Sequence, residues 1–274
     1  MNQKESNNQK MEKPKIWHYG LNTREWAEFI LDGGKEAAYF KKTIATSGQP
    51  ALDLGCGSGR LLVPFLQAGL DVDGCDYSAD MLAVCRKRLD GETLTTGLFN
   101  QPMHELDLPR RYRTIFACDV IGLGGAKHLT RLAMQRVYEH LRPEGTFAFD
   151  YQAPWNDAPY WAGWLPENRR SLPLDWFPPN RNTLPDGDEL ETAVQIFSQD
   201  SLEAVSVHKF RARLWRDGEM RQEEIQTMHT ECYSKHELLL MLELAGFKDM
   251  QIFGDYSAEP ATLDHKTLLF VARK

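Results

Sequence analysis

The chain has 274 residues, a formal net charge of −7 at pH 7 and five cysteines. This length suits one large α/β domain, or one domain that carries a sizeable insertion. The negative charge argues against nucleic acid as the default partner, because duplex-binding proteins usually present a basic face. No apolar run approaches the roughly 18–20 residues that span a bilayer, and the odd number of cysteines, none with CxxC spacing, predicts free thiols in the cytoplasm.

The first residues are expected to stay outside the folded core. Residues 1–13 are rich in Asn, Gln, Lys and Glu and contain no apolar stretch or small-residue cleavage site. We therefore expect a disordered tail rather than a signal peptide. Residues 14–48 are expected to form an N-terminal helical cap.

From residue 49, short apolar runs alternate with amphipathic stretches, which predicts a parallel sheet with crossover helices. A strand over 51–54 precedes a helix over about 58–68, in which Pro64 should remove a hydrogen bond or bend the helix. A strand over 72–76 then leads into a helix that Ser78 caps. Further strands are expected over 94–99, 114–118 and 146–150, with a helix over about 127–141 before the last of them.

The pattern changes after residue 151. Residues 152–185 hold many Pro, Trp and Arg residues and show no helical or strand period. Three strand-like runs follow at about 190–198, 203–216 and 220–231, the last two joined by a hairpin turn at Asp217-Gly218. We interpret 152–231 as an insertion on the substrate side, made of an aromatic loop and an antiparallel sheet.

The core is expected to comprise residues 49–151 and 232–274. A capping box at Ser234–Glu237 opens a helix that runs to Ala245. Two final strands are predicted at about 249–254 and 267–272.

Residues 51–60, ALDLGCGSGR, place a glycine loop between a strand and a helix. Glycines let the backbone approach a ligand closely, and a helix N-terminus offers free N–H groups. Asp76, at the end of the next strand, lies about 20 residues beyond the loop and can accept hydrogen bonds from both hydroxyls of a ribose. The sequence therefore predicts a cofactor that contains adenosine.

Two departures distinguish this loop from a dinucleotide site. The fingerprint G-x-G-x-x-G needs glycine where Arg60 stands, because the third glycine, Gly59, arrives one residue early. A carboxylate at Asp53 would repel a pyrophosphate, but it suits the ammonium group of a methionine moiety. Both departures favour S-adenosylmethionine over NAD.

Residues 51–60, Asp76 and Ser78–Met81 together resemble the class I S-adenosylmethionine-dependent methyltransferases, over about residues 49–150 and 234–274. The arrangement is most similar to the bacterial small-molecule branch that includes the antibiotic amino-sugar N-methyltransferases. The resemblance implies an α/β fold with a doubly wound, Rossmann-like sheet of seven mainly parallel strands, the last antiparallel, and the inserted sheet over its carboxyl edge. It also implies methyl transfer to N or O of a small molecule. From the charge, the lack of a long apolar run and the cysteine pattern, we expect no nucleic acid, membrane or metal to be involved.

The resemblance further implies which residues bind the cofactor. The glycine loop shapes the site of the methionine part, Asp53 contacts the amino group through water, and Asp76 holds the ribose. Tyr77 and Met81 flank the adenine. The family often has an acidic residue after the third strand that binds the adenine amine. That acid is missing here, so Gln101 is expected to contact the amine. The full set is Asp53, Leu54, Gly55, Cys56, Gly57, Gly59, Asp76, Tyr77, Met81, Gln101, Pro102, Met103, Cys118, Asp119 and, as a lid, Tyr19. Core packing by Met81 and Tyr19, and a solvated Gln101, stay open as alternatives.

On the methyl side, the protein must place a nucleophile behind the methyl carbon and exclude water. His18 and Tyr151 are the candidate catalytic residues, with a structural histidine as the alternative for His18. The N-terminal segment also offers Trp26. Candidate substrate residues follow the fifth strand: Asp150, Tyr151, Trp155, Trp161 and Trp164. Alternatively, these aromatic residues only seal the insertion onto the main domain.

Three other functions stay open. A non-catalytic S-adenosylmethionine-binding protein would have its insertion blocking the methyl end. A nucleic-acid methyltransferase is disfavoured by the charge and by Cys118-Asp-Val-Ile121, where an Asn/Asp-Pro-Pro-Tyr/Phe tetrapeptide would be expected. An NAD enzyme is disfavoured by Arg60. The oligomeric state is open, with a homodimer as one option.

Overall fold

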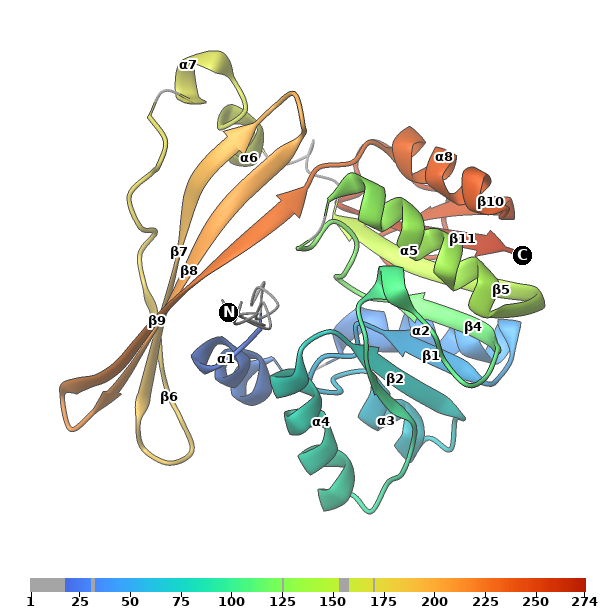
Figure 1. The fold of residues 1–274 in the computed structure, drawn as a ribbon, viewed down its shortest axis with the longest axis horizontal. Helices are drawn as coiled ribbons and strands as arrows, with labels where there is room; N and C mark the ends of the chain where they lie inside the picture. Colours follow the sequence, from blue (N-terminus) through green and yellow to red (C-terminus); the bar gives the residue numbers. More distant parts are fainter. Residues whose placement is uncertain (1–17, 31–32, 125, 153–157, 170) are drawn as a thin grey trace, which may run out of the picture.

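The computed structural model describes most of the chain, namely residues 18–30, 33–124, 126–152, 158–169 and 171–274. The predicted tail over 1–13 and Trp155 lie outside the described residues. The described residues form two sheets, one of seven strands and one of four, and Figure 1 shows how the two sheets are arranged. None of the described helices is long and apolar enough to cross a membrane.

The larger sheet contains β1 (Ala51–Leu54), β2 (Val72–Asp76), β3 (Leu98–Asn100), β4 (Tyr112–Ala117), β5 (Leu141–Gln152), β10 (Lys248–Gly254) and β11 (Thr267–Arg273). Their order is β10-β11-β5-β4-β1-β2-β3. The strands from β1 to β5 pair in parallel, whereas β11 is antiparallel to both of its neighbours. This confirms the predicted Rossmann-like sheet with an antiparallel last strand.

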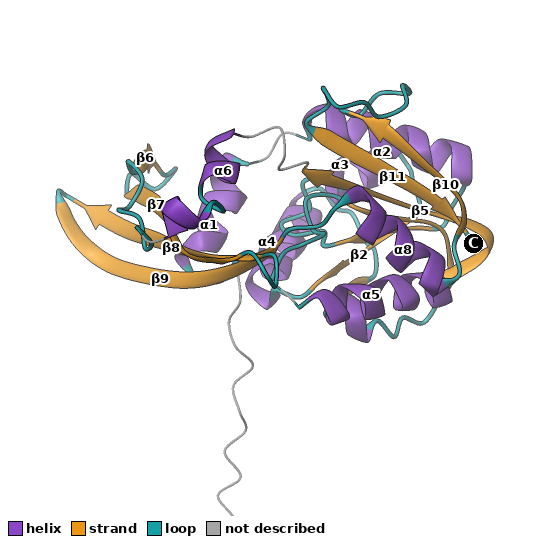
Figure 2. Ribbon diagram, turned by 90° about the horizontal axis from the view of Figure 1, so that it is seen from above, coloured by secondary structure: helices purple, strands orange, loops and turns teal. Residues whose placement is uncertain are grey.

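Helices cover both faces of this sheet (Figure 2). One face carries α2 (Gly34–Ser47), α3 (Leu62–Gln67) and α4 (Ala79–Gly91), and the other carries α5 (Lys127–His140) and α8 (Lys235–Ala245). Phe116 of β4 stacks on Phe40 of α2 with 5.2 Å between ring centroids, while its neighbour Ile115 belongs to the core beneath α5 and α8. Because successive strand residues point to opposite faces, such strands are apolar throughout.

Some predicted boundaries are wrong by a few residues. The helix expected from residue 58 begins at Leu62, because the loop continues through Gly59, whose φ is 84°. Pro64 therefore lies in the first turn of α3, where its missing N–H would have had no helical partner, so the expected loss of a hydrogen bond does not arise. The capping box at Ser234 is present as predicted, and Ser78 caps α4.

The insertion forms the smaller sheet, with β6 (Asn180–Thr183), β7 (Glu189–Asp200), β8 (Val205–Arg216) and β9 (Glu219–Glu231) in antiparallel order. The Asp217-Gly218 turn joins β8 to β9 as predicted. The expectation of an irregular stretch over 152–185 is wrong in part, because it contains β6 and two short helices, α6 (Ala158–Ala162) and α7 (Pro166–Arg169). These elements are too short to produce a period in the sequence.

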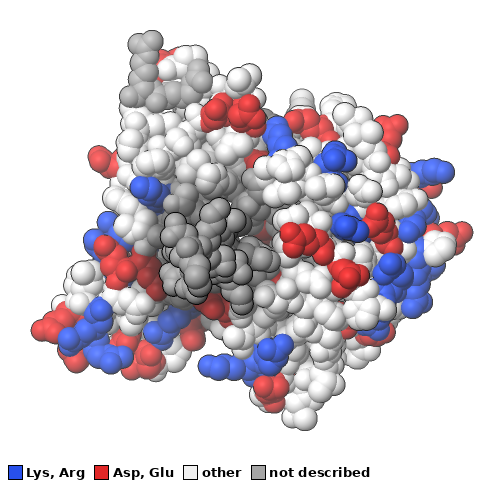
Figure 3. Space-filling model, in the orientation of Figure 1, with Lys and Arg blue, Asp and Glu red and all other residues white. Residues whose placement is uncertain are grey.

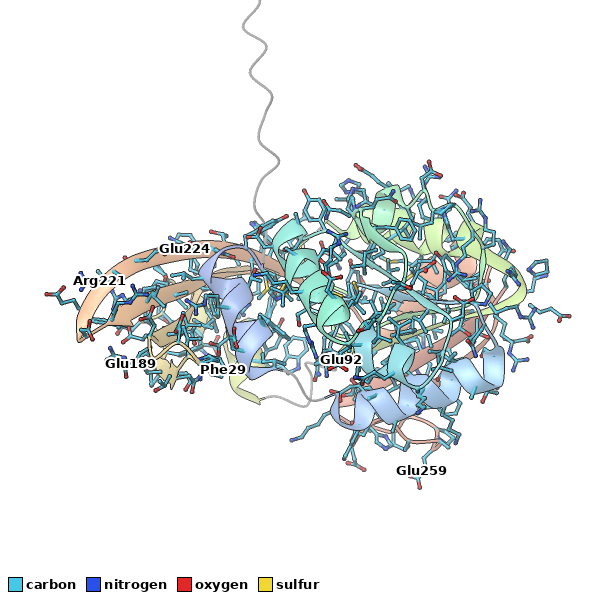
Figure 4. The ribbon with its side chains drawn as sticks, turned by 90° about the horizontal axis from the view of Figure 1, so that it is seen from below. Phe29, Glu92, Glu189, Arg221, Glu224 and Glu259 are labelled. Atoms are coloured by element: carbon cyan, nitrogen blue, oxygen red, sulfur yellow. The ribbon has the colours of Figure 1, made fainter. Side chains whose placement is uncertain are left out.

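Helix α1 (Leu21–Phe29) lies against one face of the smaller sheet, which we call the inner face (Figure 2). Leu21 packs there with Phe210 and Ala212 of β8. The N–H of Leu21 donates to Glu224 Oε2 at 2.8 Å. Glu224 lies on β9 and is labelled in Figure 4. The segment before α1 also contacts the core, since Ser78 Oγ donates to the carbonyl of His18 at 2.6 Å. The N-terminal segment therefore joins the two sheets.

Candidate cofactor site and active site

The loop after β1 folds tightly against β2. The N–H of Gly55 donates to the carbonyl of Cys75 at 2.7 Å. Gly55 and Gly57 have φ values of 81° and 53°, in the left-handed region that favours glycine. A Cβ on Gly55 would lie 2.4 Å from Cγ2 of Val120. Glycine is therefore required where this loop passes the loop that follows β4.

Asp76 ends β2 and fixes the same loop. Its Oδ2 accepts the N–H of Gly57 at 2.8 Å and its Oδ1 accepts the N–H of Ser78 at 2.7 Å. Burial raises the pKa of Asp76, and these backbone donors partly offset that rise. Each carboxylate oxygen keeps a further lone pair. Asp76 can therefore accept hydroxyl groups while it holds the loop.

A cavity of about 450 Å³ runs along the carboxyl ends of β1, β2 and β4. Small-molecule sites usually measure roughly 300–1,000 Å³. The structure brings most of the predicted cofactor residues together in its wall: Leu54, Gly55, Cys56, Gly57, Asp76, Tyr77, Met81, Gln101, Pro102, Met103, Cys118 and Asp119.

Three predicted cofactor residues do not line the cavity. Gly59 packs against α4, where a Cβ would lie 2.8 Å from Cys85 Sγ. The hydroxyl of Tyr19 donates to the carbonyl of Tyr77 at 3.5 Å, so Tyr19 contacts the backbone of a lining residue. Asp53 is buried beneath the loop. Their roles toward the cofactor stay predictions.

Asp53 and Arg60 give this end of the cavity a distinct charge pattern. Within the described residues, Asp53 Oδ2 is buried and has no hydrogen-bond partner. Burial raises the pKa of Asp53 to about 8, although the Arg60 guanidinium lowers it in part. Arg60 lines the cavity, with Nη2 3.6 Å from Asp119 Oδ2 and Nη1 3.9 Å from Glu36 Oε2. An unpaired carboxylate oxygen and a guanidinium beside a glycine loop fit the ammonium and carboxylate groups of an amino acid.

The segment after β3 forms another part of the cavity wall. The side chain of Gln101 bonds to the backbone of Asp107, accepting its N–H at 2.9 Å and donating to its carbonyl at 3.2 Å. The amide therefore supports the loop. Glu105, at the end of the 3₁₀ helix η1 (Met103–Glu105), also lines the cavity and offers a carboxylate.

Of the predicted substrate residues that the structure describes, none lines the cavity, and Asp150 and Tyr151 lie within β5. Asp150 accepts the N–H of Asp119 at 2.6 Å and the hydroxyl of Tyr256. The hydroxyl of Tyr151 accepts the N–H of Tyr233 at 2.7 Å. Asp150 and Tyr151 thus support neighbouring loops. Two more predicted residues lie in or just after α6, beside the smaller sheet: Trp161 and Trp164. Their contact with substrate stays a prediction.

Ligand atoms of Cys118, Asp119 and Asp150 lie within 4.8 Å of one another, a spacing that could hold a metal ion. Arg60 Nη2 lies 3.5 Å from Cys118 Sγ and 3.6 Å from Asp119 Oδ2. Its guanidinium already supplies a positive charge there. We therefore assign no metal to this cluster.

The N-terminal segment closes one side of the cavity. His18 and Trp26 both line it, with ring centroids 4.9 Å apart in an edge-to-face arrangement. Burial lowers the pKa of His18 to about 3, so its imidazole is neutral near pH 7.

Comparisons with known proteins show similarity to methyltransferases. Residues 51–145 match the family model described as a methyltransferase domain. A protein of Geobacillus sp. (strain WCH70) named as a methyltransferase is 26% identical over 226 residues, which cover 81% of this chain and 83% of that one. The fold matches a crystal structure of an S-adenosylmethionine-dependent methyltransferase from Clostridium acetobutylicum ATCC 824 with a TM-score of 0.68, at 15% identity, over 91% of this chain and 96% of that one. Residues 51–145 therefore form a methyltransferase domain, and the similarities support an S-adenosylmethionine-dependent methyltransferase.

Two further matches differ in what their names say they methylate. A ubiquinone biosynthesis O-methyltransferase of Rhodopseudomonas palustris (strain TIE-1) is 30% identical over 107 residues, which cover 38% of this chain and 40% of that enzyme. The sugar N-methyltransferase KedS8 from Streptoalloteichus sp ATCC 53650 shares the fold, with a TM-score of 0.68 at 16% identity, over 100% of this chain and 98% of that one. Sequence similarity to the O-methyltransferase is thus confined to about two fifths of its length.

Sequence reasoning missed several lining residues of the methyltransferase. In the sequence, Arg60 was used only as an argument against NAD. Its position directly after the glycine loop could have marked it as a residue of the cofactor site. Glu105 was missed because the acid comes in the 3₁₀ turn rather than directly after β3. The segment Val120–Gly124 also lines the cavity, and its two glycines, both with positive φ, mark a close backbone approach.

Proposed function

We propose that this methyltransferase transfers a methyl group from S-adenosylmethionine to a nitrogen or oxygen of a small molecule. The observation that carries the proposal is that Gly55 and Asp76 line the same cavity as His18 and Trp26. Bound S-adenosylmethionine supplies an activated methyl group. The acceptor's lone pair forms the new bond to the methyl carbon while the carbon–sulfur bond breaks toward sulfur, and the acceptor loses a proton.

The residues at the loop end would hold the amino-acid part of the donor. Asp53, with its unpaired Oδ2, would accept from the ammonium group directly or through water. Arg60 would pair with the carboxylate, because it is the cation in the cavity wall nearest to the glycine loop. Asp76 would accept the ribose hydroxyls.

The residues after β2 and β3 would hold the adenine. Tyr77 and Met81 line the cavity beside Asp76 and would flank the ring. We assign the contact with the adenine amine to Glu105 rather than to Gln101, because the Gln101 amide is already bonded to backbone. Pro102 and Met103 would complete this wall.

His18 is the residue that we place nearest to the acceptor. A neutral, buried imidazole can accept a hydrogen bond from an N–H or O–H group, and an amine acceptor needs no strong base once it is unprotonated. Tyr151 and Asp150 would act as positioning residues, since both bond to loops around the cavity.

The relatives' names include both a sugar N-methyltransferase and an O-methyltransferase, so both acceptor atoms stay in the proposal. On the face that Figure 3 shows, Asp and Glu side chains are interspersed with Lys and Arg, which gives no support for a nucleic-acid substrate. A cytoplasmic location and a homodimer stay predictions from the sequence.

Methyl-labelled S-adenosylmethionine and a panel of amines and alcohols test the proposal. We expect label in at least one product, together with an equal amount of S-adenosylhomocysteine. Binding of S-adenosylmethionine without transfer to any member would favour the non-catalytic alternative. Transfer to DNA or RNA instead would contradict the small-molecule assignment.

A further inference from the structure

Tyr256 lies in the turn after β10, at the same edge of the larger sheet as the cofactor cavity. Gly254 at the end of β10 pairs with Leu268, and Leu268 pairs with Tyr151 near the end of β5. Because β5 is parallel to β4 and β4 to β1, these ends lie at the carboxyl edge of the sheet, where ligands bind in open α/β folds. There the hydroxyl of Tyr256 donates to Asp150, 106 residues earlier in the chain.

The turn that carries Tyr256 is held by its neighbour Asp255. Oδ1 of Asp255 accepts the N–H of Lys266 at 3.0 Å and the N–H of Thr267 at 2.8 Å. The φ of Tyr256 is 58°, a left-handed conformation that a bulky residue adopts only where its surroundings hold it. Its ring packs edge-to-face against Phe40 of α2, with 6.4 Å between the ring centroids. The fold therefore fixes the position of the Tyr256 hydroxyl.

This hydroxyl is one of three donors that satisfy the buried carboxylate of Asp150, which is 2% exposed. Oδ2 of Asp150 accepts the hydroxyl of Tyr256 and, at 3.2 Å, the thiol of Cys118. Oδ1 accepts the N–H of Asp119 at 2.6 Å. Burial and the Asp119 carboxylate raise the pKa of Asp150, and the bond from Tyr256 lowers it in part. Loss of the Tyr256 hydroxyl would therefore leave a buried carboxylate short of a donor, which is costly.

Asp150 in turn holds two residues that contact Arg60. Asp119 has a φ of 54°, which few residues other than glycine adopt, and its N–H bond to Asp150 stabilises that conformation. Arg60 Nη2 lies 3.6 Å from Asp119 Oδ2 and 3.5 Å from Cys118 Sγ. The Tyr256 hydroxyl is therefore linked to the Arg60 guanidinium by two short paths, and both pass through Asp150.

We propose that Tyr256 is a positioning residue for the amino-acid part of the cofactor, because it orients Arg60 through Asp150. This inference rests on the proposed function, in which Arg60 pairs with the carboxylate of S-adenosylmethionine. A guanidinium that is already held in place loses less conformational freedom when it binds a carboxylate. Burial and the Asp150 carboxylate raise the pKa of Tyr256, so its hydroxyl stays protonated and remains a donor near pH 7.

Two ligands separate this role from a purely structural one. S-adenosylhomocysteine carries the amino-acid part, whereas 5′-methylthioadenosine has the same adenosine and sulfur but lacks it. Titration calorimetry measures both with the wild type and with Tyr256→Phe, which keeps the ring. We expect the variant to bind S-adenosylhomocysteine about three- to tenfold more weakly and 5′-methylthioadenosine within about twofold of the wild type. The matched control Tyr39→Phe, whose ring lies 6.0 Å from that of Tyr256, should leave both affinities unchanged.

A double-mutant cycle tests whether Tyr256 acts through Arg60. If it does, Tyr256→Phe should weaken S-adenosylhomocysteine binding no further once Arg60→Met is present, because residues that act through one contact are not additive. The same three- to tenfold loss in the Arg60→Met background would overturn the inference.

Equal weakening of both ligands by Tyr256→Phe would show that the hydroxyl serves the fold alone, and unchanged affinity for S-adenosylhomocysteine would equally overturn the inference. Should Tyr256→Phe not fold, Asp150→Asn, which keeps the size of the side chain, is measured with the same two ligands. It should again weaken S-adenosylhomocysteine selectively, and equal weakening of both ligands would again overturn the inference. Failure of the wild type to bind S-adenosylhomocysteine would instead contradict the proposed function.

Discussion

Binding of S-adenosylhomocysteine should release a proton from Asp53. Because the pKa of Asp53 is raised to about 8, only about one tenth of this carboxyl is ionised at pH 7. An ammonium group near its unpaired Oδ2 favours the ionised form and lowers the pKa. We therefore expect about 0.9 proton to leave per ligand bound at pH 7. Affinity should rise about tenfold per pH unit between pH 6 and 7, or about 1.36 kcal/mol, and level off above pH 8.

Titration calorimetry at pH 7 in phosphate and in Tris measures this proton, because the two buffers differ in ionisation enthalpy. The observed heats should differ by the buffer difference multiplied by about 0.9. Asp53→Asn cannot titrate and should show equal heats in both buffers. Equal heats for the wild type as well would refute the assignment of Asp53 to the ammonium group.

Three further outcomes follow from the geometry. Gly55→Ala should weaken S-adenosylhomocysteine binding more than tenfold in calorimetry, since its Cβ would lie 2.4 Å from Val120 at a φ of 81°; unchanged affinity would contradict the loop assignment. Asp73→Ala should lower the free energy of unfolding by about 2 kcal/mol in urea titrations, because it removes the acceptor that Arg110 Nε contacts at 2.7 Å. No measurable change in the free energy of unfolding would contradict a stabilising role of the Asp73–Arg110 pair. Burial lowers the pKa of His140. As pH falls below about 6.5, the unfolded chain therefore binds a proton before the folded protein does. The free energy of unfolding should drop by up to about 1.36 kcal/mol per pH unit, a dependence that His140→Gln should reduce.

The strands of the core could be predicted from the sequence because their local signals are strong. Ala51–Leu54 comes directly before the glycine loop and Val72–Asp76 directly before the helix that Ser78 caps, and the structure has both strands at the predicted bounds. The start of α3 was wrong, since the dihedral angles of Gly59 decide it and a sequence does not display them. The two helices between residues 158 and 169 were missed because one turn of helix has no period.

The residues that line the cofactor half of the site could be predicted from the sequence better than those of the acceptor half. Gly55, Gly57 and Asp76 depend on local geometry within one βαβ unit, and all three line the cavity. The acceptor half depends on how α1 packs against a distant sheet, which no spacing along the chain encodes.

Calorimetric titration with S-adenosylhomocysteine tests the central claim most directly, comparing the wild type with Asp76→Ala. The wild type should bind, and the variant should bind more than tenfold more weakly, a loss of about 1.4 kcal/mol or more. No binding to the wild type would contradict the assignment of the cavity to this cofactor. Equal affinity of the variant would contradict the role of Asp76.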